Sequence, residues 1–179
     1  MYMKITSPLI ISALIANFVI FSCSKDEPGP VDPSTQVLTY DVEDLEGNIF
    51  DNNQTIEFSA VDYENAVLGF YVRNTSSEII AMRIEVESMS GTDGSLMELC
   101  FGECYYGVTT GSSYPSNPSS PNVNIEPGQT QVSSGDHFFN SDGGDGNTPV
   151  EYVFKFYLAD ETGNQDGTAF RIKYRYTRN

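Results

Sequence analysis

The sequence has 179 residues, with 25 acidic and 9 basic side chains and a formal net charge of −16. Charge of this sign repels phosphate backbones and anionic headgroups, which excludes nucleic acid as a partner and any purely electrostatic attachment to a membrane. The length is enough for one ordinary domain with a hydrophobic core. The sequence contains no phosphate-binding glycine loop, and no cofactor is expected.

The chain begins with the pattern of a secretory signal. An apolar run over residues 9–20 follows a single charge, Lys4, and is too short to cross a bilayer as a stable helix. Ile20-Phe21-Ser22-Cys23 resembles the lipobox of bacterial lipoproteins, which implies removal of residues 1–22 as a signal peptide and acylation of Cys23. The mature chain then keeps 25 acidic and 8 basic residues, a net charge of −17, and is held at the membrane by lipid alone.

Residues 23–35 are expected to form a solvated tether. They contain Pro28, Pro30 and Pro33, and proline favours extended backbone without donating hydrogen bonds. The segment 24–27, Ser-Lys-Asp-Glu, resembles the signal that sends lipoproteins of Bacteroidetes bacteria to the cell surface, although a generic charged linker has the same composition. The expected location is therefore the outer membrane, exposed at the cell surface.

From Val37 onward, apolar residues recur with period two, which indicates half-buried strands. Turn-forming residues separate these segments, and no stretch carries a sustained helical pattern. The prediction is a single all-β domain over residues 36–179, an antiparallel two-sheet sandwich of immunoglobulin-like type with about eight or nine strands. The inward rows are Ile56, Phe58 and Ala60; Leu68, Phe70 and Val72; Ile80, Met82, Ile84 and Val86; Tyr152, Phe154, Phe156 and Leu158; and Phe170, Ile172, Tyr174 and Tyr176.

The last predicted strand presents a basic row, Arg171, Lys173 and Arg175. In an acidic chain we expect this row to lie opposite an acidic row such as Glu85 and Glu87, where it specifies strand register. The alternative is a basic patch for an anionic ligand.

Cys100 and Cys104 remain as a close pair once Cys23 is acylated. In an exported protein a disulfide is the default expectation, contributing about 2 kcal/mol and fixing a local turn. Two free thiols are the alternative. A metal site is not expected, because the spacing is C-x₃-C and no second cysteine or histidine pair completes it.

Two segments interrupt the strand pattern. Residues 109–121, rich in Pro and Ser, are expected to form an exposed loop with Tyr114 as its one large side chain. Residues 140–148 contain Asp142, Asp145 and Asn147, whose oxygens are candidate calcium ligands. Their spacing differs from that of an EF-hand loop, and Asp and Gly are also ordinary turn residues.

Five segments taken together resemble a β-sandwich module of exported Bacteroidetes proteins: 99–105 (LCFGECY), 125–128, 135–138, 153–157 and 170–174. The resemblance implies an accessory or spacer domain at the cell surface, with no catalytic or cofactor residues.

An enzyme is not expected. His137 is the only histidine, and the sequence contains no nucleophile elbow, so neither a catalytic triad nor a two-histidine metal site is indicated. We expect His137 to be structural, at the start of a strand. Acidic residues are so numerous that a pair at the spacing of a glycosidase is uninformative.

The favoured function is a non-enzymatic surface lipoprotein that acts as an interaction, adhesion or envelope-assembly module with a protein partner. The alternative is glycan capture through Tyr105, Tyr106 and Tyr114. A competing interpretation places Tyr105 and Tyr106 at the beginning of a strand, one packed inward and the other half-exposed.

Overall fold

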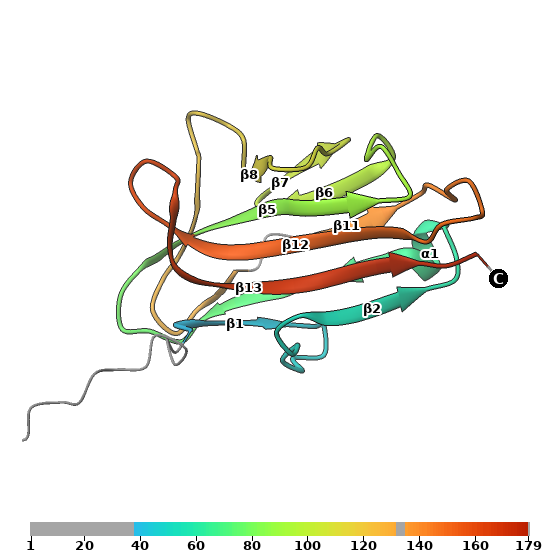
Figure 1. The fold of residues 1–179 in the computed structure, drawn as a ribbon. Helices are drawn as coiled ribbons and strands as arrows, with labels where there is room; N and C mark the ends of the chain where they lie inside the picture. Colours follow the sequence, from blue (N-terminus) through green and yellow to red (C-terminus); the bar gives the residue numbers. More distant parts are fainter. Residues whose placement is uncertain (1–37, 132–134, 179) are drawn as a thin grey trace, which may run out of the picture. The chain divides into compact units, whose positions relative to one another are not determined.

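In the computed structural model, residues 38–131 and 135–178 are described. The predicted signal peptide, Cys23 and the tether lie outside these residues. The described part carries thirteen strands and one four-residue helix, α1 (Tyr63–Ala66), so it has no helix with the length and hydrophobicity to cross a membrane. The strands, shown in Figure 1, are β1 (Tyr40–Glu43), β2 (Gln54–Phe58), β3 (Val67–Gly69), β4 (Tyr71–Asn74), β5 (Ile80–Ser90), β6 (Met97–Phe101), β7 (Glu103–Tyr106), β8 (Ser113–Tyr114), β9 (Val123–Ile125), β10 (Thr130–Gln131), β11 (His137–Asn140), β12 (Val150–Ala159) and β13 (Gln165–Tyr176).

The larger sheet has the order β2-β13-β12-β5-β8, and β9 also pairs with β5. The strands β5, β12 and β13 lie side by side in antiparallel pairs (Figure 1). Their alternating β-branched and aromatic residues fit a pleated surface with one buried face. The short strands β8 and β9 pair with different parts of β5, the first opposite Ile84 and the second opposite Ile80.

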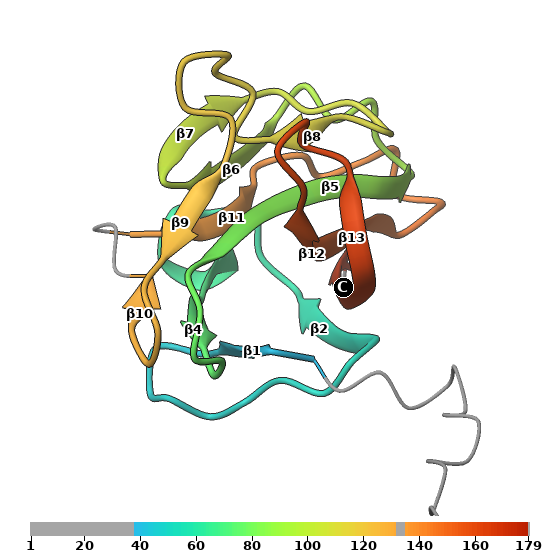
Figure 2. The same cartoon turned by 90° about the vertical axis from the view of Figure 1, so that its left-hand side faces the viewer.

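Two smaller sheets form the opposing side, with orders β1-β4-β10 and β3-β11-β6-β7. Only Phe70 separates β3 from β4, and its N–H donates to the carbonyl of Asp136 at 3.2 Å. The two sheets therefore continue one another along this strand. Figure 2 shows β10 beside β4 and β9 beside β5 at one edge of the described domain.

Aromatic rings fill the space between the sheets. Phe138 of β11 stacks on Phe154 of β12 with centroids 3.7 Å apart, and Phe70 contacts Phe138 at 4.7 Å and Phe156 at 5.2 Å. Nearly all of the rows that the alternation predicted to face inward are buried, with Ile56, Phe58 and Leu158 partly buried against the same core. The prediction of an all-β sandwich is confirmed, but the expected eight or nine strands are thirteen in the described residues, because short pieces such as β8, β9 and β10 pair separately.

One strand pair departs from the expected antiparallel arrangement. β2 pairs with β13 in parallel, from Gln54 opposite Ile172 to Phe58 opposite Tyr176. The turn before β2 fixes this register, because the Asn52 side chain accepts from the N–H of Arg171 and the N–H of Asn53 donates to its carbonyl, both at 2.9 Å. β2 thereby covers the edge of β13 that would otherwise present unpaired backbone groups.

Candidate functional site

The outer face of the β3-β11-β6-β7 sheet gathers most of the chemically distinctive side chains. Alternation along β6 directs Met97, Leu99 and Phe101 into the core and Glu98 and Cys100 to the opposite face, where Cys100 is also buried. The register on both sides of β6 then produces two rows. We call Tyr106, Glu98 and Phe139 the aromatic row, and Cys104, Cys100 and His137 the cysteine row.

Cys100 and Cys104 form the predicted disulfide within the β6–β7 hairpin. The turn between them contains Gly102, whose φ of +72° is a conformation that favours glycine. The Gly102 N–H donates to Oδ1 of Asp136 at 2.9 Å. This hydrogen bond ties the hairpin to the residue that precedes His137.

His137 begins β11, as expected of a structural histidine at a strand start. Its Nδ1 is hydrogen-bonded to the carbonyl of Gly135, an arrangement in which Nδ1 carries the proton and donates it. Nε2 then faces Cys100 Sγ at 3.8 Å and Glu98 Oε1 at 3.7 Å. The ring is almost fully buried beneath Tyr63, whose ring packs against it edge-on at 5.6 Å.

Beside the cysteine row lies an exposed apolar surface, which we call the Tyr106 surface and define as Tyr63, Leu96, Tyr106 and Phe139. Tyr106 is 78% exposed, Tyr63 54% and Leu96 52%. Phe139 connects them, because its ring contacts that of Tyr63 at 5.0 Å and it lines, with Leu96 and Tyr106, a shallow pocket of about 200 Å³. A hydrogen bond to the Glu98 carboxylate, together with its negative charge, raises the pKa of the Tyr106 phenol.

The three tyrosines proposed for ligand binding do not share a face. Tyr114 is buried in β8, so the expectation of an exposed loop residue is wrong. Its strand pairs with β5 opposite Ile84, and its ring packs 4.8 Å from that of the half-buried Tyr105. Tyr105 and Tyr106 alternate within β7, with Tyr105 packed against the core and Tyr106 exposed. The competing interpretation is therefore right about the alternation, but the two residues end the strand instead of beginning it, and Tyr106 is more than half-exposed.

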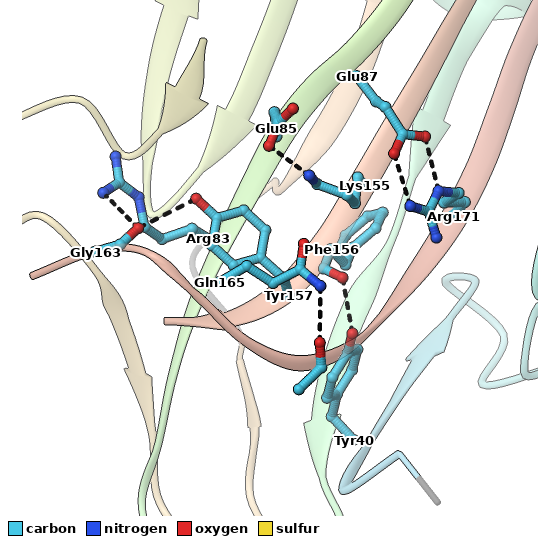
Figure 3. Close-up of polar contacts among 11 residues, drawn as sticks. Tyr40, Arg83, Glu85, Glu87, Lys155, Phe156, Tyr157, Gly163, Gln165 and Arg171 are labelled. Carbon is cyan, nitrogen blue, oxygen red and sulfur yellow. Dashed lines mark hydrogen bonds and ion pairs between the residues drawn. The ribbon is translucent and has the colours of Figure 1, made fainter. Parts of the chain in front are cut away.

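Arg171 and Arg175 of the basic row pair with carboxylates, and Arg171 does so with Glu87 as predicted. Arg171 donates to both oxygens of Glu87 at 2.7 and 2.6 Å, reaching across β12 (Figure 3). Lys155 of β12 binds Glu85 at 2.6 Å, and Arg175 lies 3.2 Å from Glu151. These partners offset the positive charge, which disfavours an anion site on this face.

The predicted calcium ligands are occupied by turn hydrogen bonds. Asp142 accepts from Thr92 Oγ1 at 2.7 Å and from the Gly144 N–H at 2.8 Å, and Asp145 accepts from the N–H groups of Asn147 and Thr148. The last two bonds lower the pKa of Asp145. The structure accounts for both carboxylates as turn-forming groups, and the calcium site stays a prediction.

The sequence indicated Cys100, Cys104 and His137 and predicted the disulfide, but it did not predict that His137 lies beside the two cysteines, and it gave no indication of Glu98, Tyr63 and Leu96. The spacing could have predicted part of this arrangement. Glu98 and Cys100 are two residues apart, as are His137 and Phe139, so each pair shares one face of its strand. The pairing of β6 with β11 joins residues nearly 40 apart in sequence, and no local pattern specifies it.

No known protein family and no curated protein matches this chain. Among solved structures, it is similar to the N-terminal domain of PorA, with 18% identity and a TM-score of 0.45 over 76% of this chain and 96% of that one. It is also similar to the CooA pilin subunit from enterotoxigenic Escherichia coli, with 12% identity and a TM-score of 0.36 over 79% of this chain and 99% of the pilin. Neither likeness is close enough to assign a function.

Proposed function

We propose that this chain is a non-enzymatic surface lipoprotein of the outer membrane, and that it binds a protein partner through the Tyr106 surface as an interaction, adhesion or assembly module. The lipobox at Cys23 and the charged segment after it support the location. The observation that carries the binding role is the exposure of Tyr106, Tyr63 and Leu96 on one sheet face. Large exposed side chains gathered in this way favour association.

The composition of the Tyr106 surface suits a protein interface. Tyrosine contributes a large contact area at low entropy cost, and interface hot spots are enriched in it. Glu98 lies between Tyr106 and Phe139 and adds one carboxylate at the centre. The favoured partner surface is therefore apolar, with a basic or hydrogen-bond-donating group placed to reach Glu98.

Site-specific photo-crosslinking on intact cells tests this function. A benzophenone amino acid replaces Tyr106 in the full chain, and in a control it replaces Ile79, which is 57% exposed between β4 and β5. We expect a discrete protein adduct from position 106 and none from position 79. Equal labelling at both positions, or none at either, would contradict a partner site at the Tyr106 surface.

Glycan capture is the second candidate, favoured by one observation. The shallow pocket beside Tyr106 is also lined by Ser95, Ser141 and Glu98, so exposed aromatic rings stand next to hydrogen-bonding groups. On a glycan array, the full chain should bind one class of sugar, Tyr106→Ala should abolish binding, and Ile79→Ser should retain it. Absence of binding by the unmodified chain would remove this candidate.

A further inference from the structure

The cysteine row combines groups that ligate borderline divalent cations. Ligand atoms of Glu98, Cys100 and His137 lie within 4.8 Å of one another, and Cys104 is bonded to Cys100. We propose that reduction of the Cys100–Cys104 disulfide converts the cysteine row, together with the neighbouring Glu98, into a Zn²⁺ site with Cys100, Cys104, His137 and Glu98 as ligands. This property goes beyond the partner binding proposed above, and Glu98, which lies between the two rows, is the residue that both would use.

The orientation of His137 supports the proposal. A histidine that binds a metal through one ring nitrogen commonly donates the other N–H to a carbonyl, which fixes the tautomer. Gly135 provides that carbonyl at Nδ1, leaving Nε2 directed at Cys100 and Glu98. With Nδ1 as the donor, Nε2 faces two further acceptors, an arrangement that a bound cation would satisfy.

The disulfide controls access to the ligands. In the oxidised chain both sulfurs are neutral and bonded to each other, so neither is a thiolate ligand. A dithiol reductant delivers two electrons and two protons, which break the S–S bond and leave two thiols, while the reductant becomes a disulfide. Zn²⁺ then displaces one proton from each thiol to solvent.

The backbone keeps the four ligands close after reduction. Cys100 and Cys104 are opposite each other in the β6–β7 pairing, with Cα atoms 4.0 Å apart, and Gly102 remains bonded to Asp136. Two thiolates, an imidazole and a carboxylate form the tetrahedral donor set that Zn²⁺ favours, whereas Ca²⁺ and Mg²⁺ require oxygen ligands. Cys104 is exposed and provides the route of entry.

The test uses the full chain in detergent, with Co²⁺ as the spectroscopic probe and Zn²⁺ as its competitor. After reduction with a phosphine, we expect one equivalent of Co²⁺ to give thiolate charge-transfer bands and the visible bands of tetrahedral cobalt, both removed by Zn²⁺. The oxidised chain should give neither. If reduced and oxidised chains behave alike, the proposal is overturned.

Variants locate the site. His137→Gln and Cys104→Ser should each weaken Zn²⁺ binding by at least the roughly 10- to 100-fold loss that follows removal of a supporting group at metal sites. Glu103→Gln is the matched control, because Glu103 lies on the same hairpin but contacts Tyr105 and Asn117 instead of the cysteine row. Circular dichroism checks that each variant folds. If His137→Gln does not fold, Glu98→Gln replaces it and should likewise weaken Zn²⁺ binding. Unchanged affinity in the variants that fold would exclude this site.

Discussion

At the scale of single residues, Tyr40 connects the two sides of the sandwich. Its hydroxyl donates to the Phe156 carbonyl at 2.8 Å and accepts from the Phe170 N–H at 3.2 Å (Figure 3 shows the first). The register between β12 and β13 shifts just beyond this pair, between Phe156 and Leu158. The phenol therefore satisfies buried backbone groups beside an irregularity in the sheet.

Removing this hydroxyl should be costly. We expect Tyr40→Phe to lower the free energy of unfolding by about 2–4 kcal/mol, because two buried backbone groups lose their partner. Urea denaturation measures the change. Tyr157→Phe is the control, since its hydroxyl makes only a half-buried 3.4 Å contact with Gly163, and it should cost less than about 1 kcal/mol. Equal costs for the two variants would contradict this role of Tyr40.

The buried tyrosines also predict instability at high pH. Burial raises the pKa values of Tyr40 and Tyr174 and raises that of Tyr152 to about 12, from an ordinary value of 10.0. Below pH 10 the phenols are neutral in both states. Above it the unfolded chain loses phenolic protons that the folded chain retains, so the free energy of unfolding falls as pH rises.

Denaturation midpoints measured at several pH values above 10 test this expectation. The free energy of unfolding should fall less steeply with pH in Tyr152→Phe than in the unmodified chain, because one phenol with a raised pKa has been removed. A slope unchanged by this substitution would show that the phenol of Tyr152 does not contribute.

At the scale of elements, the Glu87–Arg171 pair links two strands that are not neighbours. The register between β5 and β12 shifts between Val86 and Ser88, which places Glu87 at the irregularity and directs it over β12 toward β13. The pair therefore fixes β5, β12 and β13 relative to one another on the outer face. The Arg171 guanidinium lowers the pKa of the Glu87 carboxyl below its ordinary 4.5.

Because the folded pKa is lowered, the stability from Glu87 is present above pH 4.5 and is lost as pH falls through the folded value. Glu87→Gln should lower the free energy of unfolding by about 0.5–1 kcal/mol at neutral pH. The free energy of unfolding should also change less with pH below 4.5 in this variant than in the unmodified chain. Glu57→Gln is the control, since its longer 3.5 Å pair with Arg175 is more exposed and should have little effect. Acid titration of the denaturation midpoint distinguishes the two.

The β6–β7 hairpin depends on Gly102. A side chain at φ +72° is strained by about 1–2 kcal/mol, and a Cβ there would also meet Val123 at 3.0 Å. Gly102→Ala should therefore destabilise the chain more than Gly111→Ala, whose φ is +82° but whose Cβ would meet nothing within 4 Å. Thermal unfolding compares them, and equal effects would exclude a contribution from the Val123 contact.

At the scale of the molecule, the sequence predicts what alternation within one strand determines. The buried rows of β5, β12 and β13 follow from period two, and the pairing of Arg171 with Glu87 follows from charge balance. Contacts between distant segments that no charge balance indicates were not predicted. Tyr114 is buried because β8 pairs with β5, and His137 meets Glu98 because β11 pairs with β6.

The proposed attachment to the membrane leads to the last prediction. If residues 1–22 are removed as proposed, the remaining net charge of −17 gains nothing from anionic headgroups, so the proposed anchoring would come from acyl chains, each buried CH₂ contributing roughly 0.8 kcal/mol. Cells fed an alkyne fatty acid should label the unmodified protein and Cys100→Ser/Cys104→Ser, but not Cys23→Ala. Protease added to intact cells should digest the labelled protein, because the favoured location is the outer surface. Label retained in Cys23→Ala would contradict acylation at Cys23, and protection from protease would place the domain on the inner side of the membrane.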